Sequence, residues 1–236
     1  MKRICLISVL AVMLLAPVVA GAQIGKSIKL GLKIAPALSW INPSTEDYYS
    51  DGARMGISAG LITDFYFAEY YALSTGFNFM FPSGKLTFVG EDEINNIVYS
   101  PVEIHRIYNF IYLEIPLMVK MKTKEFGAFS FYGQVGFGTG FRLKTTAKDE
   151  FDDLLGGHHT KEWVYTTHTT LMREAILVGG GAEFRIDPTV HLFAGVNYSN
   201  TLHDVLTGVN DYNPLVDPVN EKGMLNFLEL SVGVLF

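Results

Sequence analysis

The chain has 236 residues, of which 49% are hydrophobic and 13% aromatic, with 18 basic residues against 24 acidic ones. The formal net charge of −6 argues against nucleic-acid binding and against docking onto an anionic membrane surface. Mean hydropathy is +0.23, and apolar residues alternating through many strands would account for this value without a spanning helix.

The first 22 residues have the features of a secretory signal peptide. A positively charged start precedes an apolar stretch, and Ala20-Gly21-Ala22 supplies small residues for cleavage. The alternative is an uncleaved membrane helix, which the break at Pro17 disfavours. Cys5 lies inside this segment and is the one cysteine, so residues 23–236 offer no thiol for a disulfide or a metal. We expect 23–236 to be a single domain with 16 basic and 24 acidic residues, a formal charge of −8.

Eight segments alternate apolar residues with small or polar ones, which is the two-residue period of a β-strand. In the first segment, the even-numbered residues from Ile28 to Ile34 are apolar, and the odd-numbered ones are lysine, glycine or alanine. In chain order, the predicted strands are 28–38, 55–65, 71–81, 108–121, 128–144, 171–186, 190–202 and 224–236.

The connections between these segments alternate in length. The long ones are 39–54, 82–107, 145–170 and 203–223, and the short ones are 66–70, 122–127 and 187–189. The sequence therefore predicts an all-β fold, an eight-stranded antiparallel transmembrane β-barrel with short periplasmic turns and long extracellular loops. A soluble sandwich or lipocalin-like barrel is the alternative. Ten strands would result if parts of 82–107 and 145–170 form hairpins.

The last predicted strand, 224–236, ends on an aromatic residue. Its even-numbered residues from Leu228 to Phe236 are apolar and would face lipid, while Glu229 would face inward. We expect this strand to close the barrel against 28–38 and to bring Glu229 toward Lys33, in a register that the sequence does not fix. By resemblance to other such barrels, Phe236 is the C-terminal insertion signal that barrel-assembly machinery is expected to read.

Charged residues fall on the inward face of several predicted strands. The interior of an eight-stranded barrel is just wide enough for side chains to fill, and a buried charge there must be paired. The alternation therefore predicts a polar network inside the barrel, with the members Lys33, Glu114, Arg142, Glu183, Arg185 and Glu229. A polar path for ions is the functional alternative, and a proton relay or catalytic carboxylate pair is a third.

Motifs for catalysis or metal binding are weak. The neighbours His158 and His159 cannot easily face one metal from an extended segment, and no third ligand has a defining spacing. A nucleophilic site at the rim would require His168, Ser199 and His203 to meet through loop folding. We therefore expect no enzyme activity, no metal and no cofactor.

The long loops offer surface for partners. Segment 145–170 carries acidic residues and then Trp163 and Tyr165, aromatic residues of the kind that anchor interfaces. This composition predicts a docking loop for other envelope proteins. The alternative is a solvated acidic loop beside lipopolysaccharide, bridged by divalent cations.

The fourth segment contains Tyr112-Leu113-Glu114-Ile115-Pro116-Leu117, which resembles the "YLEIPL" strand of the PorT-like outer-membrane β-barrel family of Bacteroidota. Gly76-Phe77 and Gly179-Gly180-Gly181-Ala182-Glu183-Phe184 are also similar to that family, and the resemblance covers about 28–236. It implies an outer-membrane barrel and, through the family's namesake, a part in type IX protein secretion. It supplies no catalytic residues. Pro116 cannot donate to a strand ladder, so we expect a bulge or a local opening there.

These observations predict a non-enzymatic outer-membrane barrel that is a structural or accessory component of an envelope assembly, with protein secretion the case implied by resemblance. A small channel is the first alternative, and a lipid-modifying enzyme with its site at the rim is the second. The expected partners are outer-membrane lipid and lipopolysaccharide, the barrel-assembly machinery and other envelope proteins, without nucleic acid.

Overall fold

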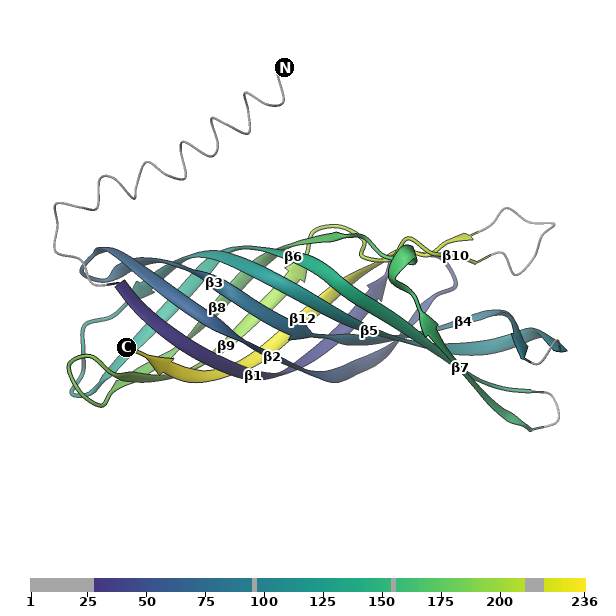
Figure 1. Ribbon diagram of the computed structural model, residues 1–236, viewed down its shortest axis with the longest axis horizontal. Helices are drawn as coiled ribbons and strands as arrows, with labels where there is room; N and C mark the ends of the chain where they lie inside the picture. Colours follow the sequence, from purple (N-terminus) through teal and green to yellow (C-terminus); the bar gives the residue numbers. More distant parts are fainter. Residues whose placement is uncertain (1–27, 95–96, 154–155, 211–218) are drawn as a thin grey trace, which may run out of the picture.

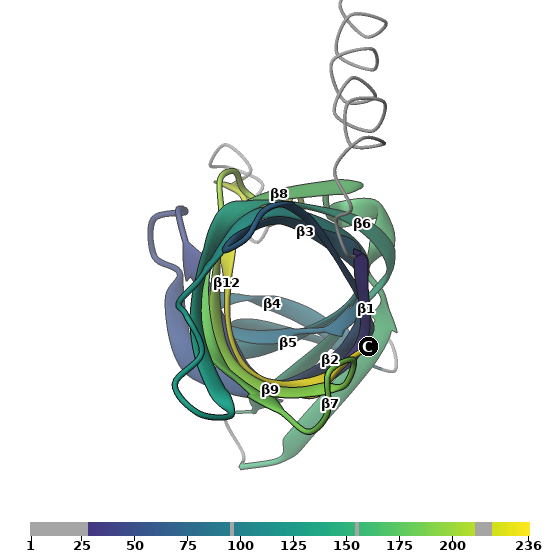
Figure 2. The ribbon, with the colours of Figure 1, turned by 90° about the vertical axis from the view of Figure 1, so that its left-hand side faces the viewer.

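The computed structural model describes residues 28–94, 97–153, 156–210 and 219–236, and the predicted signal peptide lies outside them. Within this part of the chain, eight antiparallel strands form a closed ring in which β1 pairs with β12 (Figure 2). In chain order the ring consists of β1 (Ile28–Pro43), β2 (Tyr49–Ala68), β3 (Tyr71–Phe81), β5 (Ile97–Lys122), β6 (Phe129–Asp152), β8 (Met172–Arg185), β9 (His191–Thr201) and β12 (Gly223–Leu235). The predicted eight-stranded barrel is confirmed.

Side chains alternate between the outside and the inside of this ring. On β1, the outward residues Leu32 and Ile34 are each 50% exposed, whereas Ala35 on the inward face is fully buried. The same pattern recurs on the other ring strands, so the apolar residues face outward and the polar ones inward. An apolar exterior around a polar interior is the arrangement of a barrel in lipid, and the reverse of a soluble barrel.

The two ends of the barrel differ. The terminal end holds the start of β1, Phe236 and the turns 69–70, 123–128 and 186–190, while the loop end holds the connection 44–48 and residues 202–210 and 219–222 (Figure 1). Phe236 continues the closing pair, because its amide and carbonyl both bond to the backbone of Leu30, at 2.7 and 2.9 Å.

Two of the predicted long loops are strands for much of their length. β4 (Ser83–Ile94) continues β3 beyond Pro82 and pairs with both β2 and β5, and β7 (His158–Val164) folds back on β6. β5 is 26 residues long, whereas a membrane crossing needs roughly 9–11 residues per strand. These hairpins therefore lengthen the wall past the membrane and leave the ring at eight strands (Figure 1).

Smaller elements complete the loop end. They are one turn of 3-10 helix, η2 (Thr166–His168), and the short strands β10 (Val209–Asn210) and β11 (Val219–Asn220), which pair with each other. In the described part of the chain, no helix has the length and apolar character to cross a membrane.

Pro116 produces the local opening that we expected and no bulge. The pairs between β3 and β5 keep one register on both sides of a gap. In that gap Gly76 lies opposite Pro116, and Phe77 lies opposite Ile115. The hydroxyl of Thr75 instead donates to the carbonyl of Pro116 at 2.7 Å. The register shift on β5 lies elsewhere, between Ile111 and Tyr112.

Candidate functional site

The inside of the barrel near its terminal end is filled by a cluster of paired charges. Lys120 contacts Asp64 and Glu183, at 2.7 Å in each case, and Lys122 contacts the other oxygen of Glu183. Both carboxylates are fully buried. The ring of Tyr132 lies 4.6 Å from the ammonium nitrogen of Lys120. Each carboxylate in the cluster thus has a cation, as burial in a low-dielectric interior requires.

Two further ion pairs occupy the middle of the barrel. Lys33 contacts Glu229 at 2.6 Å across the β1–β12 seam, and the hydroxyl of Ser58 donates to the second oxygen of Glu229 at 2.8 Å. Arg173 is fully buried and donates to Glu114 at 2.9 Å and to Thr201 at 2.9 Å. These contacts join strands that are neighbours in the ring or have one strand between them.

The space left between these pairs is small. A cavity of about 50 Å³ lies among Asn78, Glu114, Gln134, Asn197 and other interior residues. Paired and hydrogen-bonded side chains therefore surround a small internal cavity in the charged half of the barrel.

The loop-end half of the barrel is closed by an apolar core. Its members come from β1, β4, β5, β12 and the loops and include Ile41, Leu86, Phe88, Ile104, Phe110, Leu206, Leu225 and Phe227. All eight are at most 3% exposed. This packing fills the lumen at the loop end, beyond the ion pairs.

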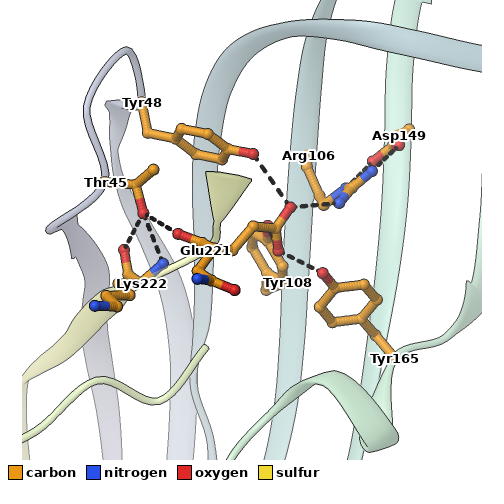
Figure 3. A network of polar contacts seen from close by, with 9 residues as sticks. Thr45, Tyr48, Arg106, Tyr108, Asp149, Tyr165, Glu221 and Lys222 are labelled. Carbon is orange, nitrogen blue, oxygen red and sulfur yellow. Dashed lines mark hydrogen bonds and ion pairs between the residues drawn. The ribbon is translucent and has the colours of Figure 1, made fainter. Parts of the chain in front are cut away.

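A buried network fastens the loop that precedes β12 onto this core (Figure 3). Glu221 is fully buried and receives hydrogen bonds from Arg106 at 2.8 Å, from Tyr108 at 3.3 Å and from Tyr165. Arg106 also binds both oxygens of Asp149, at 2.6 and 2.7 Å. One guanidinium thus joins a loop carboxylate to a carboxylate of β6.

Aromatic rings enclose the same guanidinium. The centroids of Phe88, Trp163 and Tyr165 lie 5.0, 5.1 and 5.6 Å from the central carbon of Arg106. Burial, together with the carboxylate of Glu221, raises the pKa of Tyr165. This phenol therefore stays protonated and can keep donating to Glu221.

The structure places the sequence-predicted interior residues in different surroundings. Lys33, Glu114, Glu183 and Glu229 lie in the ion pairs described above. Arg142 lies near the loop end, where it donates to the hydroxyl of Thr169 at 2.8 Å.

The prediction that Arg185 belongs to the interior network is wrong. It is the last residue of β8, where the wall ends, and its side chain is 44% exposed. Its ion pair with Glu125, at 3.1 Å, is also exposed.

The predicted docking loop also needs correction. Tyr165 is only 4% exposed, because the chain after β7 folds inward over the barrel mouth. Trp163 is partly buried against the apolar core. Tyr165 is therefore an interior residue and cannot anchor a partner.

Sequence reasoning missed Arg173, Arg106 and Glu221. Arg173 lies ten residues before Glu183 on β8, so the two-residue alternation would have predicted that Arg173 faces inward as well. Arg106 and Glu221 lie in segments predicted as loops, where no periodicity marks an inward residue.

The histidines of the β6–β7 hairpin pair with neighbouring carboxylates. His158 contacts Asp152 at 2.7 Å and His159 contacts Asp153 at 2.9 Å. Among the described residues, no three His, Cys, Asp or Glu side chains are grouped so as to hold a metal ion.

Comparison with known proteins places this architecture among membrane barrels. The family model described as "Outer membrane protein beta-barrel domain" matches residues 21–215. Neisserial surface protein A (NspA) is similar at 14% identity and a TM-score of 0.45, covering 90% of this chain and 98% of that one. OprG from Pseudomonas aeruginosa is similar at 12% and 0.41, covering 89% and 97%. The protease OmpT from Escherichia coli is similar at 10% and 0.42, covering 92% and 99%. No curated protein matches the chain.

Proposed function

Because this chain belongs to the outer membrane protein beta-barrel domain family, we propose that it serves as a non-enzymatic structural or accessory component of an assembly in the bacterial envelope. The chain is a β-barrel protein of the bacterial outer membrane. The proposal concerns what this barrel does there.

The observation that carries the proposal is the closed interior. Ion pairs such as Arg173–Glu114 fill one half of the barrel, and an apolar core fills the other. A lumen filled in this way favours a scaffold over a channel.

The hairpins beyond the membrane supply a surface for partners. β4, β5, β6 and β7 form one continuous sheet at the loop end, and β7 is its edge strand, paired with β6 alone in the described chain. An open edge strand presents backbone donors and acceptors to which an extended segment of another protein can add. We propose this sheet, which includes Trp163 of β7 but not the buried Tyr165, as the docking surface for another envelope protein.

Protein secretion through the type IX system is the specific assembly that we propose. The support for it is the resemblance of Tyr112-Leu113-Glu114-Ile115-Pro116-Leu117 to the PorT-like strand. In the structure this segment lies in β5, and β5 also contributes to the projecting sheet.

A gentle pull-down tests the proposal. The full-length protein and a variant with residues 150–160 replaced by an Asn-Gly turn are extracted in mild detergent and their partners identified. We expect envelope proteins, including secretion components, to co-purify with the wild type and to be lost from the variant. Lys124→Ala, at the opposite end of the barrel, is the control and should retain them. Recovery of this chain alone from the wild type would contradict a role in an assembly.

Hydrolysis assays on phospholipid and lipid A address the enzyme alternative. The proposal predicts no turnover above a detergent blank. Turnover that survives further purification would contradict the non-enzymatic role.

A further inference from the structure

The inward charges of the terminal half of the barrel do not balance. In the described chain, four carboxylates face five cations there. The carboxylates are Asp64, Glu114, Glu183 and Glu229, and the cations are Lys29, Lys33, Lys120, Lys122 and Arg173.

Lys29 is the cation without a carboxylate. Glu229 is bound by Lys33, Glu114 by Arg173, and the remaining two carboxylates by Lys120 and Lys122. Lys29 is the second residue of β1 and donates to the imidazole Nε2 of His191 at 2.9 Å. Its register neighbour Asp64 makes its ion pairs with Lys120 instead. The inward cluster at the terminal end therefore has three cations, Lys29, Lys120 and Lys122, against the two carboxylates of Asp64 and Glu183.

A second observation marks the same place. The hydroxyl of Tyr66 is buried and has no hydrogen-bond partner among the described residues. The centroid of its ring lies 5.8 Å from the ammonium nitrogen of Lys29 and 5.9 Å from that of Lys122. The ring of Tyr66, whose hydroxyl has no partner, thus lies near two cations, one of which has no carboxylate.

We propose that the terminal mouth of the barrel binds a small oxyanion, either inorganic phosphate or a free carboxylate. Lys29 supplies the main charge and the Tyr66 hydroxyl supplies a hydrogen bond. Lys122 adds a second positive charge, already shared with Glu183. Such an anion balances the charge at the mouth and satisfies the phenol, and both effects are stronger at a partly desolvated site than in water. Lys29 is partly exposed, so an anion reaches it from the terminal end.

Calorimetric titration of the full-length protein in a neutral maltoside detergent tests this site. Sodium phosphate and sodium acetate are titrated separately at constant ionic strength. We expect saturable heat with at least one of them, and the anion that gives it identifies the class. In Lys29→Met the affinity should fall at least about tenfold, as expected for loss of a charged hydrogen-bond partner. Tyr66→Phe should weaken binding less.

Lys124→Met is the matched control, because Lys124 is an exposed lysine at the same end of the barrel. It should bind as the wild type does. Heat-modifiability on gels checks that each variant is folded, and Tyr66→Phe preserves the test if Lys29→Met fails to fold. Absence of saturable heat with both anions, or wild-type affinity in folded Lys29→Met, would overturn the proposal.

Discussion

At the scale of single residues, Arg173 shows how the barrel interior tolerates charge. Its guanidinium is completely buried and binds Glu114 and the hydroxyls of Ser199 and Thr201. Removing one partner of such a pair leaves the other charge buried and unpaired, which costs more than the pair contributes when intact. The ion pairs are therefore a requirement for packing this interior.

Arg173→Met tests that requirement. The variant should lose about 3–5 kcal/mol of unfolding free energy, because Glu114 stays buried without its cation. Adding Glu114→Gln should restore a large part of the loss, since an amide needs no counter-charge. Denaturant unfolding of the detergent-solubilised barrel measures both. A double variant as unstable as the single one would show that the unpaired carboxylate is not the cause.

The phenols around Glu221 predict a loss of stability in alkali. Burial and the nearby carboxylate raise the pKa of Tyr165, whereas in the unfolded chain a tyrosine ionises near pH 10. Above about pH 10 the unfolded state releases a proton that the folded state retains, so stability falls as pH rises. Below that pH both states are neutral and Tyr165 adds no pH dependence.

We expect the thermal midpoint to fall between about pH 9 and about pH 11, and to fall less in Tyr165→Phe. That variant has no hydroxyl at this position, so no phenol there ionises in the unfolded chain and favours unfolding. Tyr49→Phe, at a tyrosine that is 66% exposed, serves as the control. Equal alkaline losses in the wild type and Tyr165→Phe would contradict the assignment.

The alternation of side chains was enough to place Glu114, Glu183 and Glu229 on inward faces. It did not identify their partners, because Glu114 on β5 and Arg173 on β8 meet over β6, which pairs with both strands. Which inward residues meet depends on closure and register, and a local sequence pattern determines neither. Tyr165 was misplaced for a related reason, since burial in a loop depends on how the whole loop folds.

At the scale of elements, small residues on the inward face let neighbouring strands and side chains approach closely. A Cβ added at Gly136 of β6 would lie 2.1 Å from the carbonyl oxygen of Leu117 on β5. A Cβ added at Gly133 of the same strand would meet nothing within 4 Å. The two glycines therefore have different roles.

Gly136→Ala should destabilise the barrel by about 1–3 kcal/mol, because the backbone of β5 must move to make room. Gly133→Ala should be neutral or stabilise slightly, since it only restricts the unfolded chain. Denaturant unfolding of the two variants side by side measures the difference. Equal effects would show that packing against β5 is not what requires Gly136.

The closing strand gives a second prediction at this scale. The backbone of Phe236 pairs with that of Leu30, and the residue is 51% exposed. Phe236→Ala should lower the heat-modifiable, membrane-inserted fraction if assembly machinery reads this ring. Phe129→Ala, which removes a similarly exposed ring at the same end, is the control and should insert normally. Normal insertion of both variants would mean that the ring of Phe236 carries no signal.

The ring strands followed from their alternation, but the ends of the strands did not. β4 alternates too, with Leu86 and Phe88 inward and Lys85 and Val89 outward, yet the sequence analysis placed it in the loop 82–107. The ladder continues past Pro82, because the amide of Phe110 donates to the carbonyl of Pro82 at 2.9 Å. The predicted strands therefore underestimated how far the wall extends.

At the scale of the whole molecule, side chains occupy both halves of the barrel interior. Paired charges fill the terminal half around a cavity of about 50 Å³, and an apolar core fills the loop end. The Glu221–Arg106–Asp149 network then ties the loop before β12 to the wall. This arrangement supports the proposal that the protein acts through the projecting sheet and not as a channel.

Single-channel recording in planar lipid bilayers distinguishes a closed barrel from a channel. Heat-modifiable, full-length protein is inserted at known density, with a porin of established conductance as the positive control. We expect no steady conductance steps from the wild type across the voltage range that the bilayer tolerates. Reproducible, long-lived steps that scale with the amount of inserted protein would contradict a closed barrel and favour a channel.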